Sequence, residues 1–210
     1  MNSTIWVANL SNNEKQVVLD DPTIKTEVIF SKNGGKFYYL QAEDYAGYSP
    51  LGRKAAHKFD IMELENGSRR KCKVSDFSAY DLRDLSEPKE DTLLFSGQFS
   101  NFSGLCFMHV PSKSVKTILL NNDSLDNIQN YTNPVFVNDQ TLIASSFYKL
   151  VSLNLLSKKA ITIFEKAASH FGTIRFSKNL KQIFASIENE NVIYVFGPNG
   201  QVLDMININL

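Results

Sequence analysis

The sequence predicts an all-β protein made of repeated four-stranded antiparallel units, and three observations support this prediction. The tetrapeptide Phe-Ser-Lys-Asn at residues 30–33, followed by aromatic residues, returns at residues 176–179, again followed by apolar residues. Short runs of β-branched and aromatic residues alternate with turn signals along the chain. The three Asn-Gly pairs, which favour tight hairpin turns, all fall between such runs.

The first complete unit is expected over residues 22–75. Its first two strands flank Asn33-Gly34-Gly35, a sequence typical of a hairpin turn. The four strands are expected at residues 27–31, 36–42, 57–64 and 69–75. An insertion at residues 43–57 separates the second strand from the third and lengthens this unit.

Three further units are expected over residues 76–121, 131–165 and 171–210. The second unit is the least regular, with strands at 80–85, 92–96, 105–110 and 115–120 and a turn at 87–90. The last two units have strands at 134–137, 141–147, 150–155, 160–164, 173–177, 182–187, 192–196 and 202–208. The six prolines fall in turns, in loops or at the first residue of a strand, because proline cannot donate to a central ladder.

Four-stranded units that recur in this way are typical of a β-propeller, in which each blade packs face to face on the next. We therefore expect residues 1–210 to form a single β-propeller domain with four full blades. A β-sandwich is the alternative, although a sandwich gives no reason for a motif to repeat at fixed phase.

Residues 1–21 predict a half blade, with strands at 3–10 and 15–19 and no inner pair. The C-terminus ends with its own outer strand, so no segment completes this half blade. Three explanations stay open. The chain is the C-terminal part of a longer propeller, the ring is open and self-associates, or a five-bladed ring closes with an incomplete first blade.

The sequence Phe-Ser-Lys-Asn-Gly-Gly-Lys at residues 30–36 resembles the Phe-Ser-Pro-Asp-Gly-Lys signature of WD40-like repeats in TolB-type propellers. The Pro-Asp pair of that signature is Lys-Asn in both copies here. The resemblance covers most of the chain and implies the propeller fold. It implies little about activity, because the family includes protein and peptide binders, peptidase gating domains and some lyases.

Composition excludes several classes of protein. With 22 basic and 22 acidic residues the net charge is zero, so no overall attraction to nucleic acid or to an anionic membrane is expected. No apolar run reaches the roughly 18 residues of a membrane helix, so membrane insertion is not expected. Cys72 and Cys106 are expected to be free thiols. The chain is expected to be cytoplasmic if Met1 is native, and periplasmic or secreted if an upstream signal was removed.

The binding site is expected on the face that carries the long loops, because long loops on a rigid β scaffold commonly bind ligands. Tyrosine and arginine, which anchor interfaces, occur in the insertion. The candidate residues are Asp44, Tyr45, Tyr48, Arg53, His57, Tyr131 and His170. Alternatively, these segments are solvated connections whose tyrosines pack back on the blades.

No catalytic motif stands out. His57, His109 and His170 lie in three different units without metal-ligand spacing, so neither a metal nor another cofactor is expected. The basic run at residues 69–73 is expected to protect an outer strand from edge pairing rather than to bind nucleic acid. The predicted function is non-catalytic protein or peptide binding. The alternatives are a lyase or hydrolase with its site in the propeller funnel, and a gating domain for a catalytic domain.

Overall fold

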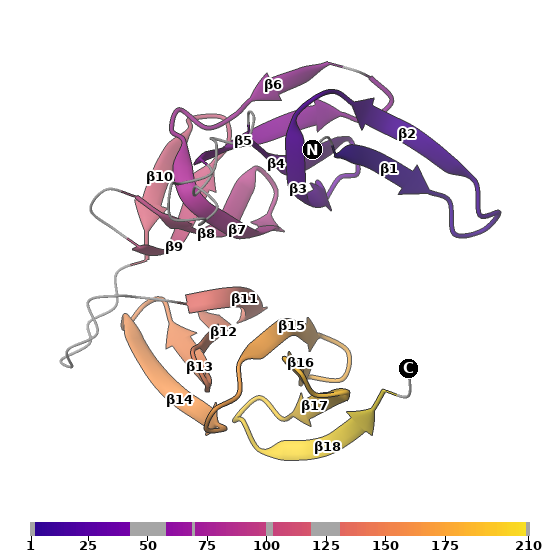
Figure 1. Ribbon diagram of the computed structural model, residues 1–210. Coiled ribbons are helices and arrows are strands. Elements are labelled where there is room, and N and C mark those ends of the chain that lie inside the picture. Colours follow the sequence, from indigo (N-terminus) through magenta and orange to yellow (C-terminus); the bar gives the residue numbers. More distant parts are fainter. Residues whose placement is uncertain (1–2, 43–57, 69, 100–102, 119–130, 209–210) are drawn as a thin grey trace, which may run out of the picture. The chain divides into compact units, whose positions relative to one another are not determined.

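The computed structural model describes residues 3–42, 58–68, 70–99, 103–118 and 131–208, and it contains 18 β-strands and no helix in these residues (Figure 1). The strands form sheets in which most neighbours are consecutive in the chain. The expectation of an all-β chain is therefore confirmed for the described part. No described helix is long and apolar enough to cross a membrane.

The chain divides into two compact units, and each is described by itself. The first comprises Met1–Phe102 and Cys106–Lys116, and the second comprises Ser103–Leu105 and Thr117–Leu210. The first unit begins with a two-stranded sheet of β1 (Thr4–Ala8) and β2 (Lys15–Asp20), drawn in indigo in Figure 1. This hairpin matches the strand pair predicted within residues 1–21.

Four strands follow the hairpin in the order predicted for the first complete unit. They are β3 (Ile24–Phe30), β4 (Lys36–Ala42), β5 (Lys58–Glu65) and β6 (Lys71–Lys73). The next four strands are β7 (Ala79–Lys89), β8 (Thr92–Gln98), β9 (Ser103–His109) and β10 (Ser114–Thr117). The sequence therefore located every strand of these two sets, with boundaries that differ by a few residues.

The two sets are joined into one eight-stranded sheet, which the sequence did not predict. Strand β6 is three residues long and pairs only with Met62–Leu64 of β5. The beginning of β5 is therefore open to β7, and Lys58 pairs with Tyr80 there. The predicted turn at 87–90 is also wrong, because β7 continues through Pro88 to Lys89.

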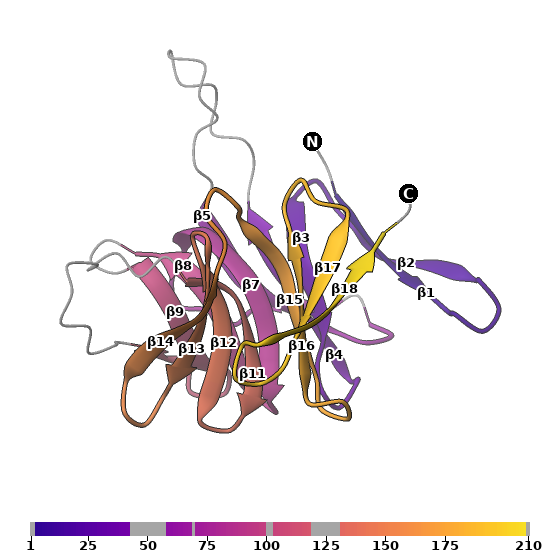
Figure 2. The same ribbon diagram turned by 90° about the horizontal axis from the view of Figure 1, so that it is seen from below.

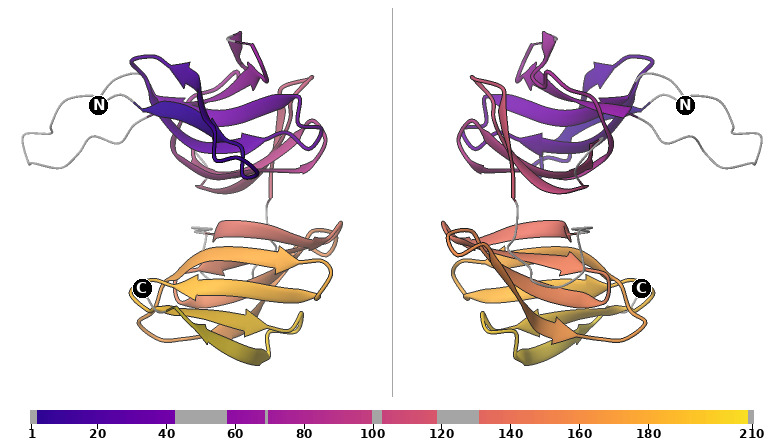
Figure 3. Two further views of the ribbon diagram at one scale, coloured as in Figure 1. Left: turned by 90° about the vertical axis from the view of Figure 1, so that its right-hand side faces the viewer. Right: turned by 90° about the vertical axis from the view of Figure 1, so that its left-hand side faces the viewer.

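The second unit consists of two four-stranded sheets with simple sequential order, seen from two sides in Figure 3. The first contains β11 (Tyr131–Asn138), β12 (Thr141–Ser146), β13 (Lys149–Asn154) and β14 (Lys159–Glu165). The other contains β15 (Phe171–Ser177), β16 (Gln182–Ile187), β17 (Val192–Phe196) and β18 (Val202–Asn207). Figure 2 shows the strands of each sheet running side by side.

The first strand of each set contains a register shift, which the sequence pattern does not reveal. One such shift in each strand lies between Thr26 and Ile29, Arg83 and Ser86, Thr132 and Val135, and Phe171 and Ile174, and β7 and β11 contain further shifts. Pro134 lies inside one of these bulges, where its missing N–H interrupts no regular ladder. The expectation that Pro134 begins its strand is therefore wrong.

Alternating side chains of β4 face two separate cores. Phe37 and Tyr39 pack with Ile5 of the hairpin. Tyr38 and Leu40 pack with residues of β7 to β9, including Phe95. Burying each of these large side chains contributes about 1.5–3 kcal/mol. In the second unit, the two sheets share a third core, which includes Ile143, Leu150, Ile183 and Phe196.

The repeated tetrapeptide builds a turn. Gly34 N donates to Ser31 O at 2.9 Å, and Gly34 adopts a positive φ of 71°. The Asn33 side-chain oxygen accepts from Gly35 N at 2.9 Å, and the Ser31 hydroxyl accepts from Lys36 N at 3.0 Å. In the second copy, Ser177 Oγ accepts from Leu180 N at 3.3 Å.

The same turn binds the second set of strands. The main-chain N–H of Lys32 donates to the buried Glu87 carboxylate, whose other oxygen accepts from Asp91 N at 3.0 Å. The Asn33 amide donates to Glu90 Oε1 at 3.0 Å. In this copy the tetrapeptide therefore has a structural role.

Candidate functional site

Five of the predicted site residues belong to the insertion and lie outside the described residues: Asp44, Tyr45, Tyr48, Arg53 and His57. The structure describes the two strands that the insertion joins. Strand β4 ends at Ala42, and β5 begins at Lys58. The predicted site therefore joins the described part of the chain at the end of the sheet that carries Ala42 and Lys58.

The other two predicted residues lie in the second unit. The sequence places Tyr131 in a loop, but Tyr131 is the first residue of β11 and only 8% of its surface is exposed. His170 is exposed and precedes β15, and its carbonyl accepts from Glu188 N at 2.8 Å. Tyr131 can therefore offer a ligand little surface, whereas His170 is accessible.

A row of three polar residues crosses the sheet where the insertion begins. Lys25 of β3 pairs with Gln41 of β4, and Gln41 pairs with Asp60 of β5. Residues that lie directly opposite in this way share one face of the sheet. Lys25 and Gln41 are buried, with 6% and 8% of their surfaces exposed.

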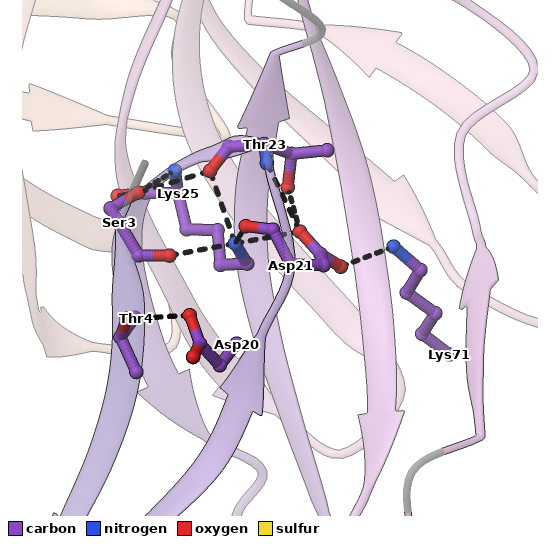
Figure 4. Close-up of polar contacts among 7 residues, drawn as sticks. All are labelled: Ser3, Thr4, Asp20, Asp21, Thr23, Lys25 and Lys71. Atoms are coloured by element: carbon purple, nitrogen blue, oxygen red, sulfur yellow. Dashed lines mark hydrogen bonds and ion pairs between the residues drawn. The ribbon is translucent and has the colours of Figure 1, made fainter. Parts of the chain in front are cut away.

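The ammonium group of Lys25 is surrounded by oxygen atoms (Figure 4). Lys25 Nζ lies 2.7 Å from the carbonyl oxygen of Ser3 and 3.0 Å from those of Asp21 and Thr23. It also forms an ion pair with Asp21 Oδ1 at 2.7 Å. Because an ammonium has three N–H groups, Lys25 has no donor left for a ligand.

Asp21 connects this network to β6. Its carboxylate accepts from the Thr23 hydroxyl at 2.5 Å and from Lys71 Nζ at 2.5 Å, as Figure 4 shows. Burial by itself raises the pKa of the Asp21 carboxyl group, but hydrogen bonds from Lys25, Lys71 and Thr23 outweigh it. The pKa of Asp21 therefore lies well below its ordinary value.

Two buried polar groups near this network have no hydrogen-bond partner within the described part of the chain. They are the Tyr39 hydroxyl and the side-chain oxygen of Gln41. These residues are two positions apart on β4, so they share one face. Burial raises the pKa of Tyr39 well above its ordinary value, so its hydroxyl stays a donor. The pair offers one donor and one acceptor, but Tyr39 is fully buried and Gln41 is 8% exposed, so neither offers a ligand much surface.

Residues 71–73 of the basic run predicted as edge protection form β6, an outer strand that pairs with β5, and Arg69 lies outside the described residues. Lys71 binds Asp21, and Lys73 Nζ lies 2.8 Å from Asp60 Oδ1. Both lysines are therefore engaged with carboxylates. Cys72, between them, is an exposed free thiol, and Cys106 is a buried one.

A second polar cluster stabilises the last sheet. Lys166 Nζ contacts Glu190 Oε1 at 2.6 Å and the Tyr194 hydroxyl at 2.7 Å. It also lies 4.9 Å from the centre of the Tyr194 ring. The hydrogen bonds that Lys166 donates to Glu190 and Tyr194 raise its pKa. This lysine stays charged, which suits a structural ion pair rather than a general base.

Sequence reasoning missed Lys25, Gln41 and Tyr39. Lys25 and Gln41 occupy strand positions that become buried only when β3, β4 and the hairpin assemble. The available signal was a lysine inside a strand otherwise rich in β-branched residues. Among the described residues, no group of three His, Cys, Asp or Glu side chains is arranged to hold a metal ion.

No protein-family model and no curated protein matches the sequence. Solved structures do match the fold, and three of them are β-propeller proteins. A nidogen/laminin complex gives a TM-score of 0.71 at 9% identity, covering 97% of this chain and 72% of that chain. An oligogalacturonate lyase in complex with manganese gives 0.66 at 12% identity, covering 95% of this chain and 58% of that chain.

TolB from Acinetobacter baumannii gives a TM-score of 0.56 at 12% identity, again covering 95% of this chain and 58% of that chain. The chain thus spans about three fifths of the length of the TolB and lyase chains. These identities support similarity of fold alone. The TM-scores and the four-stranded antiparallel sheets support a β-propeller fold for this chain.

Proposed function

We propose that this chain is a non-catalytic protein- or peptide-binding module that acts through its loop-bearing face around the insertion 43–57. One observation carries the proposal. The insertion leaves β4 and enters β5 beside a polar row that crosses the sheet, in which Gln41 lies opposite both Lys25 and Asp60. Loops that start from such an ordered β scaffold commonly bind ligands.

The surrounding residues supply a rigid base. The Lys25 network ties β3 to the N-terminal segment, and Lys73 ties β6 to Asp60. Tyr45, Tyr48 and Arg53 of the insertion belong to the residue types that dominate binding energy at interfaces. The similarity to a propeller from a nidogen/laminin complex supports a protein partner.

The proposal includes the organisation of the chain. We propose WD40-like repeats of the TolB type, with a half blade at residues 1–21 and blades at 22–75, 76–121, 131–165 and 171–210. The hairpin β1–β2 and the four successive strand sets support these boundaries. The register shift shared by the first strands of the four sets also supports them.

The test uses a library of random peptides displayed on phage, selected against the full chain. Peptides enriched on the natural chain should bind the triple variant Tyr45→Ala, Tyr48→Ala, Arg53→Ala at least about thirtyfold more weakly, since hot-spot residues contribute about 2 kcal/mol or more. The control is the double variant Tyr148→Ala, Arg175→Ala, which removes exposed residues of the same types elsewhere. Equal binding by the natural chain and the triple variant would contradict the proposal.

A lyase is the second candidate, favoured by the fold similarity to an oligogalacturonate lyase in complex with manganese. His57 and His170 are the candidate residues. The test incubates the chain with oligogalacturonates and Mn²⁺ and follows the ultraviolet absorbance of an unsaturated product. Turnover that disappears in His170→Ala would replace the binding proposal by this one.

A further inference from the structure

Strand β18 is the last strand of its sheet and pairs with β17 (Figure 1). Within the described part of the chain, its other edge has no strand partner. All six of its residues are exposed. Four of them are large and apolar, with exposed fractions of 44% for Val202, 45% for Leu203, 57% for Met205 and 44% for Ile206.

The fourth strands of the other three sets are better protected against pairing. Strands β6 and β10 are three and four residues long and carry lysine. Strand β14 has a charged residue at each end, and Ile161 is its one exposed large apolar residue. Strand β18 therefore differs from them by its four exposed apolar residues.

The main-chain groups of β18 alternate between the two edges. Ile208 N donates to Asn191 O at 2.7 Å, so Asp204 and Ile206 face β17, whereas a register shift leaves Leu203 without a partner on β17. The main-chain groups of Met205 consequently point to the open edge. Met205 N donates to the carboxylate of Asp204 at 2.8 Å, so the one charged side chain of the strand shields this edge.

A second copy of the chain fits this edge poorly. In an antiparallel pair of two β18 strands, apolar residues match best when Leu203 lies opposite Met205 and Val202 opposite Ile206. That register places Asp204 opposite Asp204 at a non-hydrogen-bonded position, where Cα atoms are about 4.5 Å apart and like charges repel. A shift of register places Asp204 opposite an apolar residue.

We propose that the open edge of β18 binds an extended segment of another protein by strand addition. The segment has a lysine or arginine opposite Asp204 and apolar residues on both sides of it. The basic side chain draws the Asp204 carboxylate away from Met205 N, which is then free to donate to the added strand. Main-chain hydrogen bonds supply affinity, and the charge pair selects partner and register.

The test measures fluorescence anisotropy of two labelled peptides with the full chain. One peptide has the core Val-Ile-Lys-Ile-Val, and the matched peptide has glutamate in place of lysine. The natural chain should bind the lysine peptide roughly tenfold more tightly, from the difference between an opposite and a like cross-strand charge pair. The variant Asp204→Lys should reverse this preference. Leu203→Ser should weaken both peptides.

The triple variant at Tyr45, Tyr48 and Arg53 serves as the control, because it should leave binding of the lysine peptide unchanged. Circular dichroism and the melting temperature check that each exposed-residue variant stays folded. The proposal is overturned if neither peptide binds, if the two peptides bind equally, or if Leu203→Ser has no effect. It is also overturned if sedimentation shows a dimer of the chain that Leu203→Ser dissociates.

Discussion

Replacing Lys25 by methionine is the sharpest test of the polar network beside the point where β4 ends and the insertion begins. The Lys25 side chain is 1% exposed, and its ammonium contacts three carbonyl oxygens and one carboxylate oxygen. Methionine fills a similar volume and removes every donor. The carbonyl oxygens of Ser3 and Thr23 and the carboxylate of Asp21 then lose a partner in a buried place.

Breaking a buried ion pair by removing one partner costs about 3–5 kcal/mol. We expect a value near the lower end, about 3 kcal/mol, because Asp21 keeps Lys71 and Thr23 as donors and its side chain is 20% exposed. The free energy is measured by urea unfolding of the full chain. Trp6, the one tryptophan, lies in β1 of the hairpin, which the network holds, and its fluorescence reports this region.

The matched control is Lys116→Met, which removes an exposed lysine of β10 and should change the free energy of unfolding by less than about 0.5 kcal/mol. A loss below about 1 kcal/mol in Lys25→Met would refute the reasoning, because it would mean that the oxygens find other partners. The double variant with Asp21→Asn separates the ion pair from the carbonyl contacts.

Three further predictions follow from the same structure. The pKa of Asp21 is lower in the folded chain than in the unfolded chain, so its contribution to stability is present above about pH 4 and is lost as the pH falls further. Asp21→Asn should therefore flatten the dependence of the free energy of unfolding on pH in this range. Gly200→Ala should lower the melting temperature far more than Gly34→Ala. Both glycines have positive φ, but a Cβ at Gly200 would lie 2.4 Å from a main-chain oxygen of β14, whereas Gly34 faces open space. Of the two thiols, exposed Cys72 should react with a disulfide reagent in the folded chain, whereas burial raises the pKa of Cys106 to about 12, so Cys106 should react only in urea.

The sequence predicted the strand sets well because each depends on local information. Alternating apolar residues, Asn-Gly turns and the repeated tetrapeptide act over a few neighbouring residues, and these signals located β3 to β5 and β15 to β18. Both errors concern pairing between strands. The extension of β7 through Pro88 depends on its pairing with β8, and the pairing of β7 with β5 depends on how far the short strand β6 covers β5.

The candidate site was predictable in part. The insertion stands out by its length and its tyrosines, but its residues lie outside the described part of the chain, so their roles stay predictions. The polar row beside the insertion was not predictable. Its residues Lys25, Gln41 and Asp60 are distant in the sequence and meet only through the register of three strands. Tyr131 shows the opposite kind of error. It was predicted to lie in an accessible loop, but it begins a strand and is buried.

The amino-acid sequence by itself determined the strand order and the antiparallel hairpins, because backbone propensity and turn chemistry are local properties. The tertiary structure alone decided which polar groups are buried, which are satisfied and which edge is open. Those properties depend on desolvation and on partners from distant strands, and neither exists until the sheets have paired and packed.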